Sequence, residues 1–75
     1  ISFYPNPTNG TIHLDFGSLQ NAVDVTVLDL EGRVVLKEVH QPEGDVQIQL
    51  NVPAGVYFMN VESNGQKAVF RIAKN

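Results

Sequence analysis

Apolar and polar residues alternate with a period of two along most of the chain, and short clusters of turn residues interrupt the alternation. This pattern is typical of β-strands that bury one face and expose the other. Residues 11–16 show it clearly, because Ile12, Leu14 and Phe16 fall on the same side. The inward-facing residues predicted for the other strands are Val23, Val25, Val27, Val46, Ile48, Leu50, Tyr57, Met59, Val61, Ala68, Phe70 and Ile72. With a short strand at residues 1–4 the count is about seven, which predicts an all-β fold, a small immunoglobulin-like antiparallel β-sandwich.

Residues 33–39 depart from this alternation, because Val34, Val35 and Leu36 are consecutive. A strand that is apolar on both faces is typical of a position covered on both sides. We therefore expect this strand to be covered on both sides at its start, and the pattern leaves its inward face undecided.

Two turns predict antiparallel hairpins. Asn64-Gly65 lies between two alternating runs, and both residues tolerate the positive φ that a type I′ turn requires, so the last two strands should pair. Asp29 and Gly32 bound a second turn, in which the carboxylate can accept backbone N–H groups and the glycine can adopt a left-handed conformation.

The four prolines mark further breaks. Residues 42–45 and 53–55 each combine a proline with a nearby glycine, which is typical of turns. Residues 4–10 contain two prolines, which donate no backbone hydrogen bond, so sheet pairing should lapse there. We expect a fixed loop whose remaining backbone groups bind elsewhere, and the isomer of the Tyr4-Pro5 bond stays open.

Length and composition narrow the class of protein. The chain has 75 residues, 43% of them hydrophobic and 17% charged, which suits one globular domain. It has no cysteine, and no apolar run is long enough for a transmembrane helix. Because it starts at Ile1, has Met59 as its only methionine and shows no signal peptide, we expect a fragment of a longer protein.

The formal net charge is −3, which argues against nucleic-acid binding. Three basic residues, Lys67, Arg71 and Lys74, nevertheless lie in the last ten positions, which contain no acidic side chain. A basic final strand can present a positive edge to a partner. Alternatively, its lysines and arginine protect an exposed edge from pairing with other strands.

Candidate chemistry is sparse. His13 and His40 have no metal-motif spacing, no serine occupies a nucleophile elbow, and the aspartates follow no calcium-loop pattern, so we expect neither catalysis nor a cofactor. Tyr57 is expected to be a core residue whose hydroxyl binds a backbone carbonyl. Asn9-Gly10-Thr11 matches a glycosylation acceptor, but a turn is the favoured interpretation.

Four segments occur together in an order that resembles a known family. They are Tyr-Pro-Asn-Pro-Thr-Asn-Gly at 4–10, Val-Leu-Asp-Leu-Glu-Gly-Arg-Val-Val at 27–35, Val-Pro-Ala-Gly-Val-Tyr at 52–57 and the basic ending at 65–75. Together they resemble the C-terminal sorting domain of proteins exported by the bacterial type IX secretion system (type A, Por secretion system). Phe58-Met59 departs from the simple aliphatic residues more usual in the family, which affects only the packing detail.

The resemblance implies a seven-stranded β-sandwich at the C-terminus of a cargo protein. It implies an address label that directs an N-terminal cargo domain through the periplasm and across the outer membrane to the cell surface or the medium. The implied partners are outer-membrane translocon and shuttle components and a sortase-like peptidase that cuts before or near Ile1. Membrane insertion and binding to nucleic acid are not implied.

Carried over onto this chain, the recognition candidates are Pro5, Asn6, Pro7, Gly32, Arg33, Gly55, Tyr57, Lys67, Arg71, Lys74 and Asn75. For the two glycines and Tyr57, the alternative interpretation is maintenance of the fold. We expect the strand at residues 66–74 to be recognised, because a strand edge can pair with a partner while basic side chains add electrostatic selection.

Two other functions remain open from the residues alone. One is a fibronectin-like or immunoglobulin-like spacer or adhesion module, although the chain lacks the tryptophan and cysteine pair of a true immunoglobulin domain. A spacer should tolerate further sequence after Asn75, whereas a terminal signal should not. The other is a subunit that oligomerises through its edge strands, which would give a concentration-dependent mass.

Overall fold

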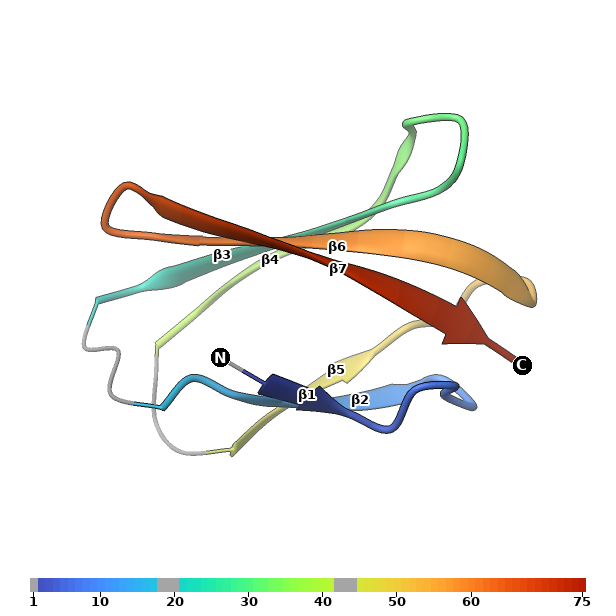
Figure 1. Ribbon diagram of the computed structural model, residues 1–75, viewed down its shortest axis with the longest axis horizontal. Helices are drawn as coiled ribbons and strands as arrows, with labels where there is room; N and C mark the ends of the chain where they lie inside the picture. Colours follow the sequence, from blue (N-terminus) through green and yellow to red (C-terminus); the bar gives the residue numbers. More distant parts are fainter. Residues whose placement is uncertain (1, 18–20, 42–44) are drawn as a thin grey trace.

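A computed structural model describes residues 2–17, 21–41 and 45–75. These residues form seven strands and no helix, so the described part contains no helix that could cross a membrane. The strands are β1 Ser2–Tyr4, β2 Thr11–Asp15, β3 Val23–Leu28, β4 Val34–His40, β5 Asp45–Gln49, β6 Gly55–Ser63 and β7 Gln66–Lys74. They form two antiparallel sheets that face each other as a small immunoglobulin-like β-sandwich (Figure 1), which confirms the predicted fold.

The smaller sheet has the strand order β1-β2-β5. Its central strand, β2, pairs antiparallel with both neighbours, with Leu14 opposite Phe3 on one side and Val46 on the other. The larger sheet has the order β4-β3-β6-β7, so β4 and β7 are its edges. Its two outer pairs are the hairpins that the turn residues predicted.

The core lies between the sheets and consists mainly of residues predicted from the alternation, although the predicted Ala68 is only half-buried and is not part of it. Of these, Ile12, Leu14, Phe16, Val23, Val25, Val27, Ile48, Leu50, Tyr57, Met59, Val61 and Ile72 are buried. Val46 and Phe70 are partly buried against them. Phe3 of β1 meets Phe70 of β7 edge-on, with ring centroids 5.2 Å apart, so aromatic packing joins the two sheets along this side.

The prediction for residues 33–39 was wrong, because β4 is an edge strand and is not covered on both faces. Val34 is 57% exposed and Val39 62% exposed. The inner face of β4 carries Leu36, Glu38 and His40, which pair with the core residues of β3. The consecutive valines reflect a shift of register between Val27 and Leu28, a β-bulge that breaks the alternation.

The turns behave as their sequences indicate. Asn64 and Gly65 have φ values of 52° and 78°, as a type I′ turn requires, and Gly32 has a φ of 85°. Tyr4-Pro5 and Asn6-Pro7 are both cis peptide bonds. The predicted turn at residues 42–45 falls largely outside the described residues, as does Ile1 of the opening strand.

Candidate functional site

The loop at residues 5–10 lies against the end of β7. The backbone N–H of Thr8 donates to the Ala73 carbonyl, and the N–H of Asn75 donates back to the Thr8 carbonyl, both at 2.9 Å. Thr8 and Lys74 thereby form a parallel β-bridge. The first turn motif of the sequence is therefore bound to the last residues of the chain.

Asn6 extends this contact with its side chain. Its Nδ2 donates to the Arg71 carbonyl at 3.2 Å, and its Oδ1 accepts the Ala73 N–H at 3.0 Å. At the end of the chain, Asn75 Nδ2 donates to Asn9 Oδ1 at 3.1 Å. We call the loop residues Asn6, Thr8 and Asn9, together with Arg71 and Ala73 of β7 and Asn75 just after it, the clasp.

Thr8 fixes the shape of the loop from inside. Its side chain is fully buried, its hydroxyl donates to the Thr11 carbonyl at 2.7 Å, and the same oxygen accepts the Gly10 N–H at 3.0 Å. The Gly10 carbonyl in turn accepts the N–H of Leu50 at 2.6 Å, just after β5. The loop is thus anchored to both sheets, and its polar groups are used within the domain.

The backbone direction along β7 follows from the same hydrogen bonds. In an antiparallel ladder, each residue directs its N–H and C=O to the same side, and successive residues alternate. Ala73 directs both groups to the clasp, so the backbone N–H and C=O groups of the odd-numbered residues of β7 point away from β6. Among the described residues, both backbone groups of Lys67 and Val69 and the N–H of Arg71 therefore have no partner. We call these three residues the free edge.

The free edge is basic and exposed. Lys67, Val69 and Arg71 lie on the outer face of the sheet, and Val69 is 57% exposed. Lys67 is opposite Glu62 on β6, but neither it nor Arg71 has an ion pair with another described residue. The outer face of the larger sheet carries an open hollow of about 400 Å³, lined by Asp24, Thr26, Leu28, Lys37, Asn60, Glu62 and Lys67.

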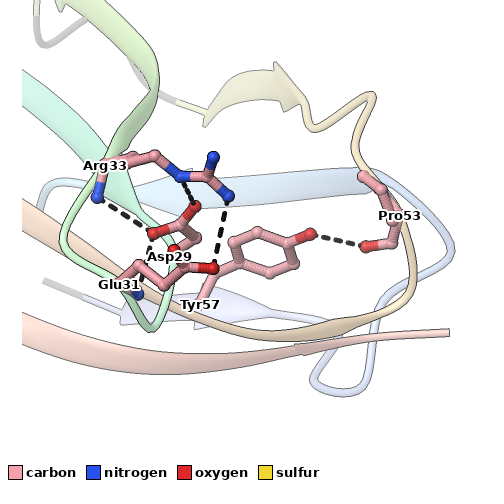
Figure 2. A network of polar contacts seen from close by, with 5 residues as sticks. All are labelled: Asp29, Glu31, Arg33, Pro53 and Tyr57. Atoms are coloured by element: carbon pink, nitrogen blue, oxygen red, sulfur yellow. Dashed lines mark hydrogen bonds and ion pairs between the residues drawn. The ribbon is translucent and has the colours of Figure 1, made fainter.

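The turn between β3 and β4 is organised by Asp29 (Figure 2). Its Oδ1 accepts the N–H groups of Glu31 and Arg33, each at 2.9 Å, and its Oδ2 accepts Arg33 Nε at 2.9 Å. The backbone N–H of Arg33, followed by its side chain and the Glu31 N–H, lowers the pKa of Asp29 from its ordinary value of 3.8, while partial desolvation opposes this. Arg33 is therefore held by the turn it belongs to.

Tyr57 is a buried residue of the core, as predicted. Its hydroxyl donates to the Pro53 carbonyl at 2.6 Å, which fixes the turn before β6 (Figure 2). A side-chain carbon added at Gly55 would lie 3.9 Å from the ring of Tyr57, an ordinary contact. Tyr57 therefore has a structural role given by its burial and hydrogen bond, and Gly55 has one given by its φ of 157°, a backbone conformation that residues with a side chain rarely adopt.

The remaining titratable groups form no catalytic arrangement within the described ranges. His13 stacks on Tyr4 with ring centroids 4.9 Å apart, and His40 Nε2 lies 2.6 Å from Glu38 Oε1. No group of three or more histidine, aspartate or glutamate side chains in these ranges could hold a metal ion.

The comparison that decides the family covers nearly the whole chain. The sequence profile described as secretion system C-terminal sorting domain matches residues 2–75. The chain belongs to this family. It is the family of type IX sorting domains that the four segments resemble. No curated protein matches the chain.

In this sorting domain, the loop after β1, the turn between β3 and β4 and the end of β7 lie toward the same end of the sandwich (Figure 1), and most candidate residues belong to these segments. Gly55 pairs with Lys74, and Phe58 pairs with both Arg71 and Leu28, the residue before the Asp29 turn. The clasp adds Asn6 and Asn75 at this end, and Pro5 and Pro7 flank Asn6 in the same loop. Lys67 alone lies near the opposite end, where it pairs with Glu62 beside the Asn64-Gly65 turn.

Sequence reasoning missed the clasp and the role of Thr8. The available signal was local: a threonine followed two residues later by glycine, a spacing at which the hydroxyl can bind the backbone. That signal predicts a turn and says nothing of the strand to which the turn binds. The sorting domain therefore unites its first and last motifs through contacts between residues more than 60 positions apart.

Proposed function

We propose that this chain is the C-terminal sorting domain of a larger secreted protein and directs a cargo domain, N-terminal to it, across the outer membrane. Membership of the type IX sorting family supports export toward the cell surface or the extracellular space. On this proposal the cargo passes through the periplasm, and translocon and shuttle components recognise the domain. A sortase-like peptidase then removes it by cutting before or near Ile1. The domain acts by being recognised and performs no catalysis itself.

The observation that carries this proposal is the clasp. Because Asn6 and Thr8 hold Arg71, Ala73 and Asn75, the end of the chain has a defined shape only when the N-terminal loop is folded against it. A receptor that binds this end therefore reads a folded domain and not a linear tail. Arg71 adds a positive charge near this end, and Lys67 adds another further along β7, and these charges can select an acidic receptor surface.

The role of each carried-over residue follows from its contacts. The groups that a partner can reach are the free edge, together with Lys74 and Asn75 at the terminus. Asn6, between Pro5 and Pro7, positions that terminus, while Gly55 and Tyr57 maintain the core. Gly32 and Arg33 form an exposed turn, which is a second candidate contact.

The direct test is a fusion of a signal peptide, a fluorescent reporter and residues 1–75, expressed in a bacterium that has the type IX system. We expect fluorescence outside the cell, and we expect deletion of residues 66–75 to leave the reporter in the periplasm. Because the deletion also removes a strand from the core, a second variant keeps all strands and adds a flexible glycine-serine tail after Asn75. A terminal signal should lose export with this tail, whereas a spacer module should tolerate it. Periplasmic retention of the intact fusion would overturn the proposal.

A further inference from the structure

The larger sheet has two free edges, and their outward-pointing backbone groups can be assigned. The backbone N–H and C=O groups of odd-numbered residues in β7 point away from β6, so those of even-numbered residues point to it. In β6, therefore, the backbone groups of odd-numbered residues point to β7 and those of even-numbered residues point to β3. The same alternation, carried through the β3 register, directs the backbone of Lys37 and Val39 on β4 away from the sheet. Each edge therefore presents unpaired peptide groups beside an exposed valine.

The cations at these edges argue against pairing between two copies of the chain. Lys37, Lys67 and Arg71 are three of the five basic residues, and all three occupy outward-pointing edge positions. Pairing the β7 edge with itself about Val69, or the β4 edge with itself about Lys37, would place like charges opposite each other across the new ladder, which is destabilising. The occupant that fits these edges is an acidic strand.

The two edges differ in charge. On β4, one lysine stands beside Val39, whereas on β7 two cations, Lys67 and Arg71, lie on both sides of Val69 on the same face. Opposite-charge pairs directly across a ladder stabilise strand pairing, so two such pairs around an apolar contact favour β7. We propose that the free edge of β7 binds an extended acidic segment of the export machinery by strand addition, with two acidic side chains opposite Lys67 and Arg71 and an apolar residue opposite Val69.

The clasp sets the length of this contact. Beyond Arg71 the outward groups of β7 are already bound to Asn6 and Thr8, so the added strand can pair only with residues 67–71. Five strand residues span about 17 Å, so main-chain hydrogen bonds are few and the charge pairs contribute a large share of the selectivity. This inference rests on the proposed function for its biological role, but the binding itself can be measured without secretion.

The test uses the 15N-labelled chain and an acetylated, amidated peptide, Thr-Glu-Thr-Val-Thr-Glu-Thr, which presents its acidic and apolar residues on one face in either strand direction. We expect the amide signals of Lys67, Val69 and Arg71 to shift. The dissociation constant should rise at least about fivefold in the Lys67→Gln/Arg71→Gln variant and again at high salt. The matched control, Lys37→Gln, should leave it unchanged. Equal binding of a peptide with lysine in place of glutamate, or equal shifts at Lys37 and Val39, would overturn the proposal.

Two proline variants test the main-chain hydrogen bonds of the proposed strand addition. Val69→Pro and Val39→Pro each remove an outward N–H without removing a hydrogen bond of the existing ladder. Only Val69→Pro should abolish the peptide-induced shifts, and binding that survives Val69→Pro would overturn strand addition. Comparing the export assay with the peptide assay separates this inference from the proposed function. If the fusion is exported although the peptide does not bind, only the inference is wrong. If the peptide binds but the fusion is retained, only the proposed function is wrong.

Discussion

At its carboxyl end β7 is held on both sides, by β6 and by the clasp, whereas its amino end has β6 on one side only. The two halves of β7 therefore differ in how many of their backbone groups are hydrogen-bonded within the domain. Through the backbone of residues 71–75 and the Asn75 side chain, this end holds the N-terminal loop against the sandwich, so changes that remove these hydrogen bonds should act through folding. The outward backbone of residues 67–69 and the exposed side chains of Lys67, Val69 and Arg71 remain open, so changes there should act through a partner. The contrast separates effects on stability from effects on recognition within a single strand.

The largest contrast is expected between two aliphatic residues of β7. Ile72 is fully buried, whereas Val69 is 57% exposed. Ile72→Ala should lower the free energy of unfolding by about 2–5 kcal/mol through lost burial and the cavity it leaves. Val69→Ala should change it by less than about 0.5 kcal/mol. Urea denaturation measures both, and equal effects would show that the burial contrast along β7 is wrong.

The next effect concerns the clasp. Asn6→Ala removes the bonds to the Arg71 carbonyl and the Ala73 N–H, and should cost about 1–2 kcal/mol of unfolding free energy. The amide of Ala73 should also exchange with solvent faster. Asn51→Ala, at an exposed asparagine, is the matched control and should have almost no effect. Unchanged exchange at Ala73 in the Asn6 variant would contradict the clasp.

A smaller effect, remote from β7, is expected at Asp29 and is visible as a pH dependence. Hydrogen bonds from the Arg33 and Glu31 N–H groups lower the folded-state pKa of this carboxyl below 3.8. Its contribution to stability is therefore complete above that value and is lost as the pH falls through the folded-state pKa. The difference in thermal midpoint between the wild-type chain and Asp29→Asn should be constant near neutral pH and should shrink at acid pH.

The Asp29 variant also serves as a check on the clasp. Because the turn is not part of β7, the exchange of the Ala73 amide at neutral pH should follow only the change in global stability. A difference in midpoint that stays constant down to about pH 2 would show that the Asp29 network does not depend on charge. Faster exchange at Ala73 alone would show a coupling between the turn and the clasp that the described contacts do not contain.

Features that depend on the local sequence were predicted correctly, whereas a feature that depends on neighbouring strands was not. The alternation identified the buried residues of β2, β3, β5, β6 and β7, because period two is imposed by the backbone itself. It failed at β4, where Val34 and Val35 gave the appearance of a covered strand, since a bulge and an edge position are set by neighbouring strands and not by the local pattern. The turns at Asp29 and Asn64 were predicted because their chemistry is local.

In the candidate site, too, the local motifs could be predicted from the sequence, whereas the contact between them could not. The basic residues of β7 and the proline loop were each visible as motifs, but their contact joins Asn6 to Arg71 and Ala73. No local rule gives a pairing over such a separation in sequence. The division of β7 into a clasped and a free half depends on this contact, so it needed the structure.

The most direct test of the account is the export rate of the reporter fusion carrying Lys67→Gln/Arg71→Gln, measured beside the Lys37→Gln fusion. Both variants should retain the wild-type unfolding free energy to within about 0.5 kcal/mol, because the substituted side chains are exposed. Export should fall for the β7 variant and stay at the wild-type level for the β4 variant. Wild-type export of the folded β7 variant would contradict recognition through Lys67 and Arg71.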